Sequence, residues 1–152
     1  MTMKKFFKGF VCAFRGLIAC AKEERNFRFH LAVAFHLFVY LPFFELTKGE
    51  TCVIVMLCGA VLSLEAVNSA IERAVDCTGE YSPRAGAAKD MAAGAVLIAA
   101  AVSVIAGVAL LWQPKAFAAI GRFFLREPWA IAVQLLAGAA SVRLIFFPKS
   151  KA

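Results

Sequence analysis

Four long apolar segments run through the chain, separated by short turns that contain Gly or Pro. They cover residues 27–46, 51–71, 91–112 and 129–147. Each approaches the roughly 20 residues that a helix needs to cross a bilayer. The pattern therefore predicts an all-α fold, a polytopic transmembrane helix bundle with three core spans and a fourth one near the C-terminus.

The beginning of the chain follows a different, amphipathic pattern. On a helical projection at ~100° per residue, Lys4, Lys8, Arg15 and Lys22 fall within about 40° of one another, and phenylalanine and aliphatic residues occupy the opposite half. This pattern predicts a surface helix over 3–24 whose basic side meets phosphates or anionic headgroups. Simple anchoring to the membrane explains the pattern equally well.

Composition and charge agree with a small membrane protein. Of the 152 residues, 62% are hydrophobic, which is too apolar for an ordinary soluble domain. Basic residues gather before the first span, between the second and third, and at the C-terminus, so the positive-inside rule places these regions in the cytoplasm. Three basic residues between the third and fourth spans weaken this bias. Lipid headgroups and phosphates explain the net charge of +7 better than nucleic acid does.

A row of acidic residues leaves the second apolar segment on one helical face. Glu65, Glu72 and Asp76, here called the acidic stripe, fall within about 40° of one another, and Asn68 lies about 60° away. Carboxylates facing lipid are costly, so the stripe predicts a bound ion, a partner or a reaction. The alternative is a helix end that simply emerges into water.

Another acid, Glu24, precedes the first span at the same expected membrane depth. Glu24 and Glu72 together offer hard oxygen ligands with room for substrate phosphates, which is typical of a magnesium site. The alternative is a local ion pair of Glu24 with Arg28 at i+4. His36, inside the first span, is expected to bond to a neighbouring helix as a neutral imidazole rather than to bind a metal.

Residues 77–88 are predicted to form a turn between the second and third spans, because they include Gly79 and Pro83. The third helix is expected to begin at Lys89 and Asp90, where an ammonium and free backbone amides would together suit a phosphate. The positive-inside rule explains the presence of this lysine more simply. Small residues on both sides of it predict close packing against the acidic helix.

Several kinds of chemistry are excluded by missing motifs. The chain has no Walker A sequence, no kinase-type Gly-rich loop and no HRD or DFG motif, which excludes the chemistry of soluble kinases. It has no GxSxG, HExxH or Cys/His cluster either. The five cysteines form no CxxC pair, and their odd number argues against a disulfide framework.

Four segments carry a resemblance to a known family. They read AFRG at 13–16, ERNFRFH at 24–30, EAVNSAIERAVD at 65–76 and AAKDMAAGAVL at 87–97. Over roughly 5–112, the chain resembles the small integral-membrane lipid kinases of bacteria, the diacylglycerol kinase and undecaprenol kinase family. The NFRxH sequence is similar to that of the undecaprenol kinase branch.

The resemblance implies transfer of the ATP γ-phosphate to undecaprenol, with diacylglycerol as the alternative acceptor, at the cytoplasmic face of the bacterial inner membrane. It implies a homotrimer whose active sites are shared between subunits, a cytoplasmic N-terminus, and a kinase domain over 1–112. Phosphoryl transfer depends mainly on positioning and charge neutralisation, which suits so small a set of polar groups.

The resemblance also implies a role for each polar residue at the predicted site. Glu65 would be the general base, supported by Asn68, and Glu24 and Glu72 would hold Mg²⁺. Glu65 and Ser69 would contact the lipid. ATP would be bound by Lys5, Lys8, Glu24, Glu72, Asp76, Glu80, Lys89 and Asp90.

The chain departs from the family in two places. The family often has HPLAK before AAKD, and here residues 82–86 read SPRAG, so a nucleotide contact by that His or Lys is missing unless Arg84 replaces it. Residues 113–152 add a predicted helix at 129–147 with no catalytic signature. Arg143 in this helix lies close enough to its end to reach the interface.

Two other classes of function stay open. A cation-binding membrane protein or transporter would use the acidic stripe as a cation path, but such a path requires acids spread through the bilayer depth. A non-catalytic assembly protein would leave Glu65→Gln without effect in every assay.

Overall fold

The computed structural model describes residues 3–79 and 82–147. This part of the chain contains no strand and is built of six α-helices and one short 3-10 helix, which confirms the all-α prediction. The elements are α1 (Met3–Glu23), α2 (Arg25–Tyr40), η1 (Leu41–Phe43), α3 (Lys48–Asp76), α4 (Pro83–Leu111), α5 (Pro114–Arg126) and α6 (Trp129–Phe146).

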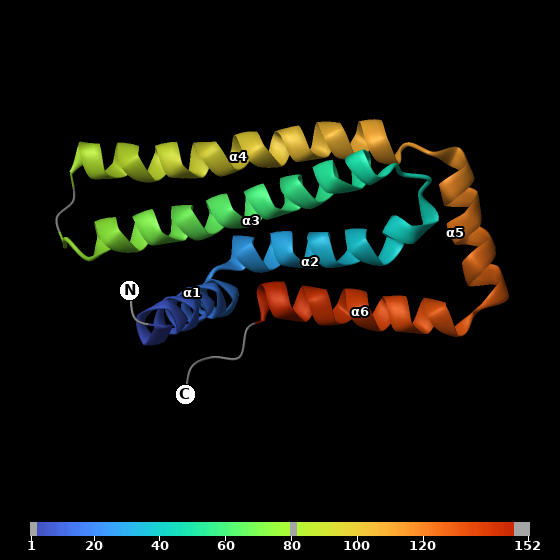
Figure 1. Cartoon of the computed structure of the whole chain (residues 1–152), viewed down its shortest axis with the longest axis horizontal. Helices are drawn as coiled ribbons and strands as arrows, with labels where there is room; N and C mark the ends of the chain where they lie inside the picture. Colours follow the sequence, from blue (N-terminus) through green and yellow to red (C-terminus); the bar gives the residue numbers. More distant parts are fainter. Residues whose placement is uncertain (1–2, 80–81, 148–152) are drawn as a thin grey trace.

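Four helices lie side by side in the order α4, α3, α2, α6 (Figure 1). Helix α5 crosses one end of this row, and α1 lies at the opposite end beside α2. By length and composition, α3, α4 and α6 are able to cross a membrane. Helix α2 has 16 residues and is shorter than these three.

Local sequence explains where α2 ends and α3 begins. Pro42 has no N–H to donate to the carbonyl of Phe38, so the α-helical hydrogen-bond pattern stops at Tyr40 and the chain continues as η1. The predicted span to residue 46 is therefore wrong at this end. Helix α3 opens with a capping box, in which Glu50 N donates to Thr47 Oγ1 at 3.2 Å and Thr47 N donates to Glu50 Oε2 at 2.8 Å.

Helix α4 begins earlier than the sequence indicated. Ser82 caps it by accepting a hydrogen bond from Ala85 N at 3.2 Å, and Pro83 fits the first helical position because its missing N–H needs no partner there. Lys89 consequently lies inside the helix, where backbone amides are already bonded. The prediction that this helix begins at Lys89, with free backbone amides beside it, is therefore wrong, and a phosphate contact by the Lys89 side chain stays a prediction.

Helix α5 was not expected from the apolar segments. It begins at Pro114 and packs its aromatic residues on the η1 region, with ring centroids of Phe43 and Phe123 5.4 Å apart. Gln113 joins two turns at this end, because its Oε1 accepts from Glu45 N at 3.0 Å and its Nε2 donates to Leu110 O at 3.0 Å. The end of the molecule opposite the acidic stripe is thus held together by side chains.

Candidate active site

The second half of α3 buries polar side chains where α1 and α2 pack against it. Glu65, Asn68 and Ser69 are only 4%, 7% and 3% exposed, whereas Glu72 is half-buried and Asp76 is exposed. Burial therefore decreases along the acidic stripe toward the end of the helix. A simple helix end in water would not bury its first carboxylate in this way.

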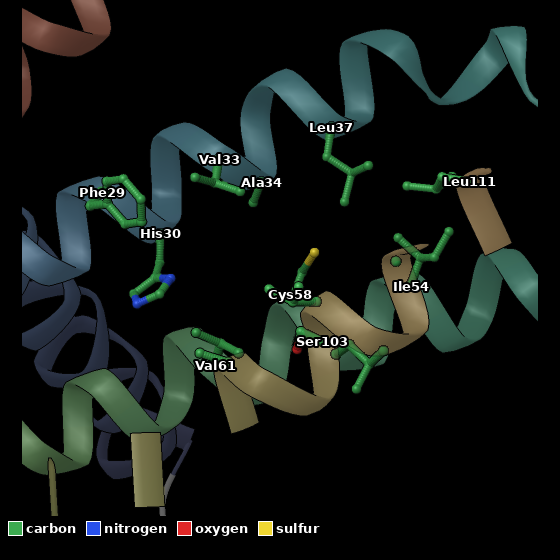
Figure 2. Close-up of a pocket in the computed structure, with 14 residues that line it drawn as sticks. Phe29, His30, Val33, Ala34, Leu37, Ile54, Cys58, Val61, Ser103 and Leu111 are labelled. Atoms are coloured by element: carbon green, nitrogen blue, oxygen red, sulfur yellow. The ribbon is translucent and has the colours of Figure 1, made fainter. Parts of the chain in front are cut away.

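Glu65 has a histidine neighbour from α2. His30 Nε2 lies 3.5 Å from Glu65 Oε1. Figure 2 shows the imidazole pointing away from α2 toward α3. This separation is longer than the roughly 2.6–3.2 Å over which two groups exchange a proton directly, so the contact is an electrostatic one.

Asn68 connects the buried part of the stripe to Glu72. Its Nδ2 donates to Glu72 Oε1 at 2.9 Å, which fixes this carboxylate one turn along the helix. The amide oxygen of Asn68 is buried and has no hydrogen-bond partner in the described part of the protein. An unpaired buried oxygen is costly, so this group is suited to a ligand that supplies a cation or a donor.

Glu24 is the single residue between α1 and α2, and its backbone is extended. Its Oε1 accepts a hydrogen bond from Arg73 on α3 at 2.8 Å, and Arg73 also lies 3.2 Å from Glu23. The alternative prediction of an ion pair with Arg28 is wrong, because that side chain bonds to helix-end carbonyls instead. Folding thus brings Glu24 against the second half of α3, which carries Glu65 and Glu72.

The predicted nucleotide-binding residues on α1 and α4 and at the end of α3, here called the rim residues, are less buried than Glu65. Lys89 forms an ion pair with Asp76, across the turn between α3 and α4. Asp90 is exposed on α4, and Lys5 and Lys8 are exposed on α1. Glu80, the remaining predicted contact, lies outside the described residues. Only the pairing of Lys89 with Asp76 brings two of these rim residues together in the described chain.

Metal binding by protein groups alone is not supported by the described residues. Nowhere in 3–79 and 82–147 do three or more His, Cys, Asp or Glu side chains gather as a metal site. Magnesium ordinarily keeps several waters and uses one or two carboxylates together with substrate phosphates. Glu72, which is bonded to Asn68, offers a carboxylate of the kind that this mode uses, whereas Glu24 is paired with Arg73 in the described chain.

A cavity of about 410 Å³ lies between α2, α3 and α4 and includes His30 in its lining. The other lining residues are almost all apolar. Figure 2 shows Ile54 and Leu111 at the end opposite His30, with Leu37 between. The cavity thus joins the polar site to the apolar interior of the helix row.

Comparison with known proteins supplies the family. Residues 11–111 match the model of the prokaryotic diacylglycerol kinase family. The chain belongs to this family. Its prokaryotic diacylglycerol kinase segment ends with the last residue of α4, so α5 and α6 lie outside it.

Several named relatives support the match. The chain is 45% identical to an undecaprenol kinase of Bacillus subtilis over 114 residues, 74% of this chain and 92% of the relative. It is 36% identical to a diacylglycerol kinase of Synechocystis over 67% of this chain and 59% of the relative. Against the diacylglycerol kinase of Escherichia coli K12, identity is 52% over 35% of this chain and 44% of the relative. No solved structure matches.

Family membership confirms the resemblance seen in the sequence and makes the chain a membrane lipid kinase. Kinases of this kind use ATP, typically with a metal ion. Two members of the site were missed by the reasoning from sequence, His30 beside Glu65 and Arg73 beside Glu24. His30 had a signal, because it ends the NFRxH sequence that marks this branch.

Proposed function

We propose that this protein is an undecaprenol kinase that transfers the γ-phosphate of ATP to the lipid hydroxyl at the cytoplasmic face of the bacterial inner membrane. One observation carries the proposal: the buried carboxylate of Glu65 lies beside His30 at one end of an apolar cavity. A hydroxyl at that point would have a base beside it and a hydrocarbon channel behind it. The identity to an undecaprenol kinase supports the same substrate.

The cavity favours a prenol over a diacylglycerol. A prenol is a hydrocarbon chain with one terminal hydroxyl, whereas a diacylglycerol also carries two ester groups that need polar partners when they are buried. His30 and Ser103 are the polar residues of the lining. Ser69 Oγ is committed to Glu65 O at 2.9 Å, so we assign it to holding the helix beside the lipid hydroxyl.

Glu65 acts in the proposed mechanism as the general base that takes the proton of the lipid hydroxyl. The hydroxyl oxygen bonds to the γ-phosphorus of ATP while the bond from this phosphorus to the leaving oxygen of ADP breaks. Asn68 holds Glu72 in place through its amide, and Glu24 and Glu72 would hold Mg²⁺. Bound Mg²⁺ would neutralise the phosphate oxygens of ATP. Charge neutralisation and alignment are the main requirements of phosphoryl transfer.

The rim residues complete the proposed nucleotide site. Lys89 is released from Asp76 to meet a phosphate, and Lys5 and Lys8 approach the triphosphate from α1. Asp76 and Asp90 would face the nucleotide, and the same role for Glu80 rests on the family resemblance alone. A homotrimer with a cytoplasmic N-terminus, as the family resemblance implies, would bring further rim residues from neighbouring subunits.

The deciding experiment measures transfer of labelled γ-phosphate from ATP to undecaprenol and to diacylglycerol in mixed micelles with magnesium. Wild type is compared with Glu65→Gln and with Glu45→Gln, a control acid at the other end of the molecule. We expect faster transfer to undecaprenol, and a loss of about 10² to 10⁴-fold in kcat for Glu65→Gln only, the range expected for a general base.

Three results would contradict the proposal. Transfer to neither lipid by folded wild-type protein would exclude a lipid kinase. A clear preference for diacylglycerol would reverse the order of the two substrates. Full activity of Glu65→Gln would exclude the carboxylate as the base.

A further inference from the structure

Helix α6 lies beyond the segment that matches the family, yet it packs along α2 (Figure 1). Gln134, Ser141 and Ile145 are spaced so that they fall on one side of this helix. Each of the three makes a hydrogen bond to a residue of α2. These three residues therefore form the face of α6 that binds α2.

The middle of this contact is a histidine with both ring nitrogens engaged. His36 Nε2 lies 3.1 Å from Ser141 Oγ, and His36 Nδ1 lies 3.1 Å from Gln134 Nε2. This confirms the expectation that His36 bonds to a neighbouring helix. Polar side chains that bond across helices hold membrane helices together.

The end of the contact is a buried arginine. Arg28 is 3% exposed, and its Nη2 donates to Ile145 O at 3.2 Å while its Nη1 donates to Lys22 O at 2.9 Å. Both carbonyls belong to the last turn of a helix, α6 and α1 respectively. Each helix C-terminus carries about half a negative charge, so the two ends together balance one guanidinium. Arg28 thus ties the end of α6 to the end of α1.

Arg28 makes these hydrogen bonds close to Glu24, the proposed metal ligand. Glu24 is the single residue that joins α1 to α2, and Arg28 follows it by one helical turn. The direction of the Glu24 side chain depends on how the two helices meet. Any contact that fixes their angle therefore also fixes the distance from this carboxylate to Glu65 and Glu72.

We propose that α6 is a positioning element of the kinase, which acts through its bonds to His36 and Arg28 to hold Glu24 where the metal–nucleotide complex binds. The proposal rests on the function proposed above for the site itself. It gives the C-terminal helix a role, although none of its residues touches the acidic stripe in the described chain.

The first test is kinetic. The double variant Gln134→Leu/Ser141→Ala removes both bonds to His36 and leaves the acidic stripe intact. We expect KM for Mg–ATP to rise by about threefold per lost bond, with KM for undecaprenol unchanged. Ser63→Ala, an exposed serine on α3, is the matched control and should behave as wild type. A purely structural role would lower the amount of active enzyme without separating the two KM values.

The second test needs no kinase activity. Cys20 is buried between α1 and α3, whereas Cys12 on the same helix is exposed. We expect the double variant to increase maleimide labelling of Cys20 relative to Cys12, as measured by mass spectrometry. Ser141→Ala alone, a milder change, should give a smaller increase if the double variant proves unstable.

The outcomes separate the two proposals. Unchanged labelling of Cys20 would show that α6 does not hold the α1–α2 junction. Increased labelling with an unchanged KM for Mg–ATP would show that the junction does not control the site. If the wild type transfers phosphate to no lipid, the proposed function fails. Labelling of Cys20 still decides whether α6 holds the α1–α2 junction.

Discussion

A buried carboxylate in a membrane helix is costly unless something in the protein uses it. Glu65 has His30 from α2 beside it, and its burial depends on α1 and α2 covering this part of α3. Glu72 lies two turns along the same helix, and Glu24 is bonded to Arg73, the residue next to Glu72. A cation between these acids would relieve the repulsion between their charges, which is the residue-level reason to expect a metal requirement.

The metal requirement predicts a specific defect in Glu72→Gln. Loss of one carboxylate charge should raise the magnesium concentration for half-maximal activity by about tenfold or more. Kinase activity titrated with MgCl₂ at saturating ATP measures this shift. Glu45→Gln serves again as the control. If Glu72→Gln has the same magnesium dependence as the wild type, Glu72 is not a metal ligand.

Side chains that share one helix were predictable, and those that meet across helices were not. The spacing of Glu65, Asn68 and Glu72 placed them on one face, and the structure confirms that they cluster. The bond from Arg73 to Glu24 joins residues 49 positions apart. It exists only because the extended backbone at Glu24 folds α1 back toward α3, which no local pattern specifies.

At the scale of elements, continuity of α3 is the feature on which the site depends. The helix carries an apolar first half and the acidic stripe without a break, and the acids are confined to its second half. Its start is fixed by the capping box of Thr47 and Glu50, far from the acids. A change at the cap should therefore lower the stability of α3 without changing the activity that depends on the acids.

This separation of stability from activity can be measured with Thr47→Ala. Loss of the cap should lower the free energy of unfolding by about 1 kcal/mol, because Glu50 N loses its acceptor. Unfolding in mixed micelles with increasing denaturing detergent reports this change. The specific activity of the folded fraction should match that of the wild type. The same is expected of Thr78→Ala, whose hydroxyl donates to Val75 O. A large loss of activity in Thr47→Ala would contradict the separation.

The length of the apolar segments predicted which parts of the chain are helical, but it predicted the ends of the helices less well. Proline set the end of α2 and the start of α4, and both boundaries moved away from the apolar limits. Helix α5 has too many polar residues to register as an apolar segment. The signals for it were Pro114 and helical spacing of its aromatic residues, which contact η1 only in the folded chain.

At the scale of the molecule, the row of helices leaves much of α4 uncovered. Leu97, Ile98 and Ile105 are 70%, 67% and 71% exposed, and Val96 is the one buried residue of the helix in the described chain. Such a face suits lipid or a second subunit. The proposed homotrimer would use it to bring Lys89 of one subunit near the Glu65 of another.

Subunit sharing predicts rescue between two inactive variants. Glu65→Gln and Lys89→Ala are purified separately, mixed in detergent and reassembled. If one site draws these residues from different subunits, activity should reappear in the mixture and peak near equal proportions. If the activity of the mixture only equals the sum of the activities of the two separate variants, each site takes both residues from one subunit.

Helix α6 runs back from α5 along α2, toward the end of the row where α2 begins (Figure 1). A chain that stopped at Leu111 would finish at the end opposite the acidic stripe. Because Ile145 O accepts a hydrogen bond from Arg28 at the start of α2, α6 ends on the side of the row that holds Asp76. A reporter enzyme fused behind α6 is therefore expected on the side of the membrane where we propose that the nucleotide binds.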